Sequence, residues 1–123
     1  MKKECKLQKE FFKMRVVNKT PENPKSFRLE YFILKTNVEV DGMNVTVYGL
    51  EVVKKQMDRE VLHTETKTIK NITVSYKQIE QIAELMAMHL VTPITLQDVV
   101  EDIIVEQNIS LPDNLTYLKD IAV

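Results

Sequence analysis

Paired carboxylates are the side chains of this sequence best placed to do chemistry. Glu30 and Glu51 fall in neighbouring predicted strands, each close in sequence to a tyrosine, Tyr31 or Tyr48. Two carboxyl groups in one cavity could work as general acid and base, because their mutual repulsion would raise the pKa of one of them. Basic residues flank both acids, so we expect the acids to point to solvent as ordinary ion-pairing groups.

Metal ligands are scarce, since Cys5, His63 and His89 are the only thiol and imidazole groups in the sequence. The segment His63-Thr64-Glu65 matches the first half of a zinc deaminase signature, but the Pro-Cys-x-x-Cys that would complete it is missing. An acidic cluster could bind a divalent cation and comprises Asp98, Glu101, Asp102 and Glu106. It lacks a second set of ligands and a turn that would bring its oxygens together around an ion. We therefore expect no metal and no cofactor.

Length and composition indicate one globular domain. The chain has 123 residues, of which 44% are hydrophobic and 28% charged. Two isolated glycines cannot build a phosphate-binding loop. The lone cysteine forms no internal disulfide, and no apolar run approaches the roughly 20 residues of a membrane span. We expect a cytoplasmic protein without a membrane partner.

The net charge of −1 hides an asymmetry between the two halves of the chain. Residues 1–75 carry 15 Lys and Arg against 10 Asp and Glu, whereas residues 76–123 carry 2 against 8. The favoured interpretation is that the halves face each other or solvate their own surfaces. The functional interpretation is a dipolar surface that steers a charged partner.

The first half of the chain has the patterns of β-strands. Apolar residues alternate with basic ones near 11–17, and a two-residue period from Phe27 predicts a strand that is central because it is apolar on both faces. Asp41-Gly42 predicts a two-residue hairpin turn. The apolar pattern then changes phase, which predicts a bulge around Tyr48-Gly49. The polar segment 61–73 is typical of an edge strand.

The second half has the patterns of helices. Ser75 is expected to cap a first helix, with Gln78 closing a capping box. Pro93 is expected to prevent this helix from continuing. A second helix is expected to begin at Thr95, with Asp98 three residues later. Its apolar stripe comprises Leu96, Val99, Val100, Ile103 and Ile104. In the tail, the apolar residues Leu115, Leu118 and Ile121 have a near-helical spacing, which predicts one short docking helix.

These elements predict an α+β fold, a four-stranded mostly antiparallel meander followed by a helical hairpin packed on one sheet face. The single domain 1–123 divides into a basic N-terminal extension (1–9), a β-rich half (10–74), a two-helix half (75–107) and a C-terminal tail (108–123).

Three segments together resemble a known family: Arg28-Leu-Glu-Tyr-Phe32, Tyr48-Gly-Leu-Glu51, and Val91-Thr-Pro through Val99-Val-Glu-Asp102. The chain resembles, over residues 27–104, a family of small uncharacterised cytoplasmic proteins of clostridial Gram-positive bacteria. The family is a domain of unknown function, so the resemblance implies no activity and no catalytic residue. The basic start and the tail beyond Glu106 depart from the family pattern.

We therefore expect a non-enzymatic protein-interaction or regulatory module whose partner is another protein or a second copy in a homodimer. The predicted interface residues are Asp98, Glu101, Asp102, Leu115 and Leu118. No small-molecule substrate is identified. One alternative is an enzyme whose site includes Glu30, Tyr48, Glu51 or His63.

A second alternative is a single-stranded nucleic-acid-binding protein that uses the basic β-rich half. Aromatic and basic residues are mixed there, as in a sheet on which nucleic-acid bases stack. They are Phe11, Phe12, Lys13, Arg15, Phe27, Arg28 and Tyr31. The sequence pI near 6.1 disfavours nucleic acid, and we expect the aromatic side chains to fill the core.

Overall fold

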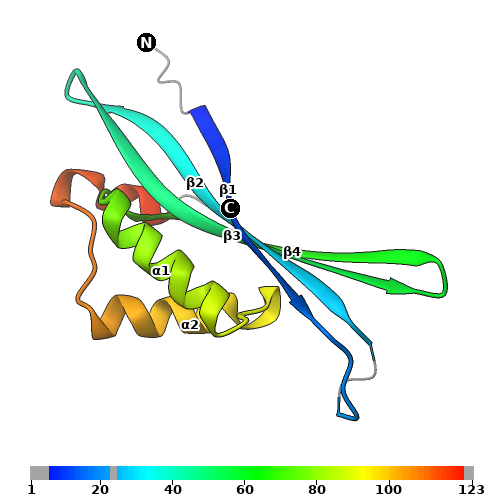
Figure 1. Cartoon of the computed structure of the whole chain (residues 1–123). Coiled ribbons are helices and arrows are strands. Elements are labelled where there is room, and N and C mark those ends of the chain that lie inside the picture. Colours follow the sequence, from blue (N-terminus) through cyan, green and yellow to red (C-terminus); the bar gives the residue numbers. More distant parts are fainter. Residues whose placement is uncertain (1–5, 23–24, 121–123) are drawn as a thin grey trace.

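A computed structural model describes residues 6–22 and 25–120. One antiparallel sheet has the strand order β1-β2-β3-β4, with bounds Lys6–Val17, Phe27–Val40, Met43–Asp58 and Val61–Thr73. Three helices follow, α1 (Tyr76–Met88), α2 (Pro93–Glu106) and the 3-10 helix η1 (Asp113–Asp120). Both α-helices lie on the same side of the sheet (Figure 1), so the predicted α+β fold is confirmed.

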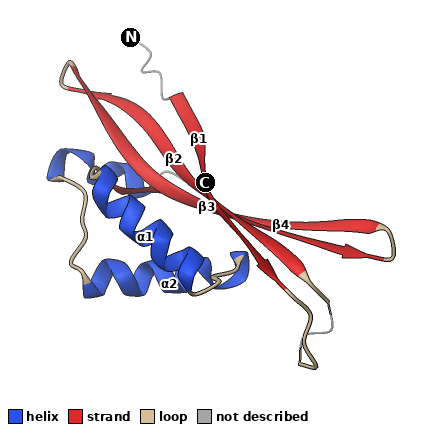
Figure 2. Ribbon diagram, viewed as in Figure 1, coloured by secondary structure: helices blue, strands red, loops and turns tan. Residues whose placement is uncertain are grey.

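The long β2–β3 hairpin forms the centre of the sheet (Figure 2). Its predicted turn is confirmed: Val40 pairs with Met43, and the two residues between them have positive φ, 52° at Asp41 and 77° at Gly42. The polar strand β4 lies at one edge, as predicted. At the other edge β1 begins at Lys6, so the sheet includes part of the segment 1–9 that was expected to precede it.

The predicted irregularity at Tyr48-Gly49 is present in the β3–β4 pairing, but its extra residues belong to β4 and not to β3. The β2–β3 pairing runs through Gly49 without a shift, whereas β4 places two extra residues between the pairs Tyr48–Thr73 and Leu50–Ile69. Asn71, within this bulge, has a left-handed φ of 58°. The bulge lets both Ile69 and Ile72 pack in the core beneath the helices, although a regular strand would put them on opposite faces.

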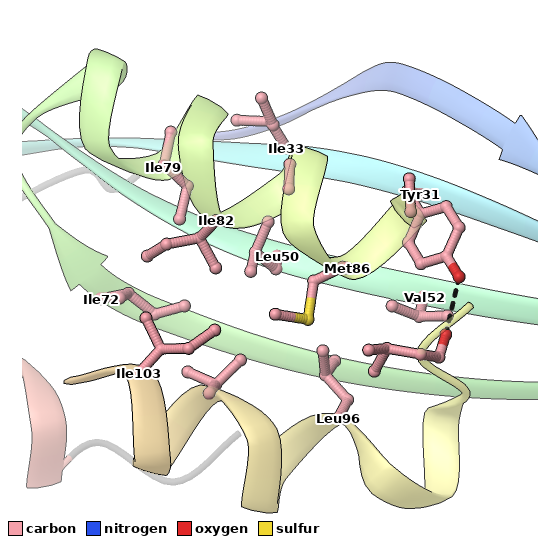
Figure 3. Close-up of a cluster of buried hydrophobic side chains, with 14 of the residues drawn as sticks. Tyr31, Ile33, Leu50, Val52, Ile72, Ile79, Ile82, Met86, Leu96 and Ile103 are labelled. Atoms are coloured by element: carbon pink, nitrogen blue, oxygen red, sulfur yellow. Dashed lines mark hydrogen bonds between the residues drawn. The ribbon is translucent and has the colours of Figure 1, made fainter. Parts of the chain in front are cut away.

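The larger core lies between the sheet and both α-helices (Figure 3). Cross-strand neighbours Ile33 and Leu50, and likewise Tyr31 and Val52, point toward the helices. The helices add their apolar stripes, with Ile79, Ile82 and Met86 from α1 and Leu96, Val100 and Ile103 from α2. The stripe of α2 is the one predicted from the three- and four-residue spacing, and the buried residues of α1 have the same spacing. We call this side of the sheet the helix-covered face.

The helix starts differ in detail from the prediction. The Ser75 hydroxyl caps α1 by accepting the Gln78 N–H at 3.2 Å, but the Gln78 side chain bonds to Thr73 instead of closing a box. Helix α2 begins at Pro93, and the prediction of a start at Thr95 was wrong. Thr92 is its N-cap and Thr95 closes the capping box, because proline with its fixed φ suits the first helical position. Within the described residues, neither helix is long and apolar enough to cross a bilayer.

The tail wraps from one side of the sheet to the other. Helix α2 covers one face, whereas Leu111, Leu115 and Leu118 pack in a second cluster on the opposite face, against residues such as Val38 and Val47. Asn71 of β4 donates a hydrogen bond to the Leu118 carbonyl oxygen, at 3.1 Å. The predicted docking helix is thus the 3-10 helix η1, packed on its own domain. Ile121 lies outside the described residues.

Removing the hydroxyl in Tyr31→Phe is expected to lower the free energy of unfolding by about 1–2 kcal/mol. The Tyr31 side chain is 2% exposed and its hydroxyl donates to the Val91 carbonyl oxygen at 2.8 Å, which ties β2 to the α1–α2 connection. Chemical denaturation of both proteins at neutral pH measures the difference. An unchanged unfolding midpoint would contradict this role.

The same tyrosine predicts a pH dependence. Burial raises the pKa of Tyr31 to about 12, so the unfolded chain loses this proton near pH 10 while the folded chain keeps it. Its contribution to stability is complete below pH 10 and is lost as the pH rises from 10 toward 12. Tyr31→Phe should lose less stability across this window than the unmodified protein does, and parallel pH profiles would contradict the assignment.

Candidate functional site

The face of the sheet opposite the α-helices is only partly covered, and we call its uncovered part the open sheet face. Strand pairing places its side chains in rows that cross all four strands. The three rows are Phe11–Phe32–Glu51–Thr68, Met14–Glu30–Val53–Thr66 and Val16–Arg28–Lys55–Thr64. Helix η1 and the residues before it cover the other end of this face.

Both candidate catalytic acids lie on the open sheet face, and each is bound by its own partners. Glu51 accepts a hydrogen bond from Thr68 at 3.0 Å and pairs with the Lys9 ammonium at 2.9 Å. Glu30 pairs with Arg28 and Lys55, each at 3.2 Å. Because every carboxylate oxygen has a neighbouring donor or cation, this arrangement fixes side chains across the sheet and does not form a shared acid–base dyad.

An aromatic pair lies beside these ion pairs. The rings of Phe11 and Phe32 meet edge to face with centroids 5.6 Å apart. The Lys9 ammonium lies 4.6 Å from the Phe32 centroid, so this one cation contacts both the ring and Glu51. The Phe32 ring is held between neighbours, while the Phe11 side chain is 57% exposed.

Strand β1 exposes an apolar row along its whole length. Large hydrophobic side chains stand on the open sheet face at Leu7, Phe11, Met14 and Val16. In the described part of the chain β1 pairs only with β2, so its outer backbone edge is open. An apolar row beside an unpaired edge is the arrangement to which an extended segment of another protein can add.

The bulge in β1 decides which aromatic residue joins this row. Phe12 is an extra residue between the pairs Phe11–Phe32 and Lys13–Tyr31. Phe12 therefore packs against the core beneath α1, and the Lys13 ammonium pairs with Glu84 of α1 at 2.8 Å. Phe11 alone of the two consecutive phenylalanines reaches the open sheet face.

A second candidate surface, which is concave, lies between the two α-helices, and we call it the interhelical groove. Its volume is about 560 Å³. Buried Met86 and Ile103 contribute to its lining together with half-buried Leu85 and Val99. Asp102 and Glu106 of α2 also line the groove, with His89 on the α1 side. The groove thus combines apolar walls with two exposed carboxylates.

The residues of the predicted enzyme site do not converge. Tyr31 and Tyr48 belong to the helix-covered face, opposite Glu30 and Glu51. Tyr48 stacks edge to face on Tyr76, with centroids 5.4 Å apart. His63 is exposed on β4, paired with Gln56 far along the sheet from Tyr48. These side chains share no pocket.

The predicted interface residues separate into two groups. Asp98, Glu101 and Asp102 are exposed on α2, and of these Asp102 lines the interhelical groove. Leu115 and Leu118 are buried against the sheet, so their side chains contact their own domain. Cys5 lies outside the described residues. Among those described, no group of three or more His, Cys, Asp or Glu could hold a metal ion.

The nucleic-acid set is likewise divided between the two faces. Phe11 and Arg28 stand on the open sheet face, whereas Tyr31 is buried beneath the helices. Phe12 and Phe27 also pack against the core, as expected for aromatic residues that fill it. The exposed Phe11 was not distinguished from these by the sequence pattern.

Comparison with known proteins places most of the chain in one family. The family of unknown function DUF6514 matches residues 8–106, which span the sheet from β1 to β4 and both α-helices. Neither a curated protein nor a solved structure shows a significant match to the chain. Because the match covers well over half of its length, the chain belongs to the DUF6514 family of unknown function.

Proposed function

We propose that this protein is a non-enzymatic protein-interaction module that docks an extended segment of a partner protein against β1. The observation that carries the proposal is the exposed apolar row Leu7, Phe11, Met14 and Val16 beside the open edge of the same strand. Added main-chain hydrogen bonds would supply affinity, and the apolar row would select alternate side chains of the incoming segment. We further infer a cytoplasmic setting in a clostridial Gram-positive host, as the sequence resemblance implies.

The charges of this surface support a protein partner. Each of the cations Lys9, Arg28 and Lys55 on the open sheet face is paired with Glu51 or Glu30, which leaves this cluster a single positive charge. A surface whose cations are already paired attracts an anionic polymer weakly, whereas the apolar row remains free to bury area against a protein.

Replacing Phe11 by serine is expected to abolish partner binding while changing stability little, because the side chain is 57% exposed. The matched control is Met57→Ser, whose side chain is 61% exposed at the far end of the β3–β4 hairpin. Immobilised wild-type protein and both variants would be incubated with host lysate, and the retained proteins identified by mass spectrometry.

The proposal requires a protein retained by the wild type and by Met57→Ser but lost from Phe11→Ser. If the two variants retain the same proteins, or the wild type retains none above an unloaded matrix, the proposed function is wrong. Circular dichroism of the variants establishes that they are folded before the comparison.

Single-stranded nucleic acid is the second candidate, favoured by the Phe11–Phe32 pair and Lys9 on an antiparallel sheet face. It requires binding of labelled oligonucleotides at low salt, falling steeply as salt is added. It also requires that Phe11→Ser weaken this binding, since base stacking would involve the exposed ring. Absence of binding at low salt removes this candidate.

A further inference from the structure

The interhelical groove has the shape of a helix-binding site. Its lining extends along one side of α2 from Thr95 through Val99 to Glu106, with Leu85 and Leu90 on the opposing wall. At a rise of 1.5 Å per residue this is roughly 16 Å, or about three turns of a bound helix. A helix that offers apolar side chains at three- and four-residue spacing could lay them along this floor.

The charges around the groove are of one sign. Asp102 and Glu106 line it, and no lysine or arginine is among the lining residues of the described chain. Helix α2 contains no basic residue, and α1 contains only Lys77, in its first turn. Asp102 and Glu106 form no ion pair with any part of the chain that the structure describes. Their charges are therefore available to a cationic partner.

The carboxylates of Asp102 and Glu106 indicate which kind of partner could occupy the groove. A second copy docked groove to groove would bring Asp102 and Glu106 against the same carboxylates, and like charges at close range repel. Anionic lipid surfaces and nucleic acids are repelled for the same reason. A helix with lysine or arginine beside its apolar stripe matches both the floor and the carboxylates.

We propose that the interhelical groove binds a cationic amphipathic helix of a partner protein, with Asp102 and Glu106 pairing to its basic residues. This site lies on the opposite side of the sheet from the apolar row of β1, so the inference is independent of the proposed function. The two surfaces would let one chain hold an extended segment and a helix at the same time.

The test uses the full chain and a fluorescein-labelled peptide of leucine and lysine, about 18 residues long, with leucines at helical spacing. A peptide of the same composition, with leucine and lysine in an order that has neither the helical nor the two-residue period, is its control, because it forms no apolar stripe either as a helix or as a strand. Fluorescence anisotropy measures the affinity of each. We expect the helical peptide to bind and the control peptide to bind at least tenfold more weakly.

A matched pair of double variants tests whether the helical peptide binds in the interhelical groove. The double variant Asp102→Asn with Glu106→Gln is expected to bind the helical peptide roughly tenfold more weakly. Asp98→Asn with Glu101→Gln removes the same charge from the same helix, but neither side chain lines the groove, so this pair should weaken binding clearly less than the groove pair does. No binding by the wild type, equal affinity for both peptides, or equal weakening by both double variants would each overturn the proposal.

Discussion

Replacing Leu96 by alanine is expected to lower the free energy of unfolding by about 2–5 kcal/mol. Leu96 is 0% exposed and packs where α2 meets the sheet and α1 (Figure 3). The truncation removes buried apolar area and leaves a cavity that the surrounding strands cannot fill by collapsing. Urea denaturation followed by far-ultraviolet circular dichroism measures the change.

The matched control for this prediction is Ile94→Ala, in the first turn of the same helix. Ile94 is 79% exposed, so its truncation removes little buried area and should change stability by less than about 0.5 kcal/mol. Both variants alter helix propensity similarly, which leaves burial as the difference between them. Equal losses at the two positions would contradict the packing of α2 on the sheet.

The elements of this fold could be predicted from the sequence because burial imposes periodicity. The alternation from Phe27 follows from one strand face meeting the helices, and the stripe from Leu96 to Ile104 follows from one helix face meeting the sheet. The turn at Asp41-Gly42 was predictable because both of its central residues adopt positive φ. Each of these signals is local, and each is confirmed.

Errors arose where two local signals competed. Thr92 and Thr95 are both suitable helix caps, and proline suggested a break when it is in fact the first residue of α2. The phase change of β3 suggested a bulge in that strand, but the extra residues belong to β4. A bulge is a property of a strand pair, so one strand's sequence cannot say which partner carries it.

The candidate surfaces depend on long-range geometry that no local pattern encodes. Phe11 and Phe12 are adjacent and identical, and only the register of β1 on β2 sends one to the open sheet face. Leu115 and Leu118 have the spacing of an exposed docking stripe, yet the tail carries them around the sheet to bury them. The acidic residues of α2 were identified from sequence, but not that Asp102 lines a groove.

Replacing Gly49 by alanine is expected to lower the free energy of unfolding by about 3 kcal/mol, the upper end of the usual cost of overpacking. A Cβ at this position would overlap the Ile69 carbonyl oxygen and lie 2.8 Å from the Lys70 Cα. Both contacts are with backbone, which cannot move without opening the β3–β4 pairing at the bulge. Denaturation measures the loss. Relative to the wild type, the variant should show faster hydrogen exchange at residues 69–73 and little change in β2.

Gly42→Ala separates this steric effect from the general cost of removing a glycine. Gly42 lies in the β2–β3 turn with φ of 77°, and a Cβ there would meet nothing within 4 Å. Its replacement should cost only about 1 kcal/mol, from the left-handed backbone that alanine disfavours. Because Gly49 has no such φ, a larger loss at Gly49 than at Gly42 can come only from the close approach of β4. The reverse order would mean that the bulge does not pass over Gly49.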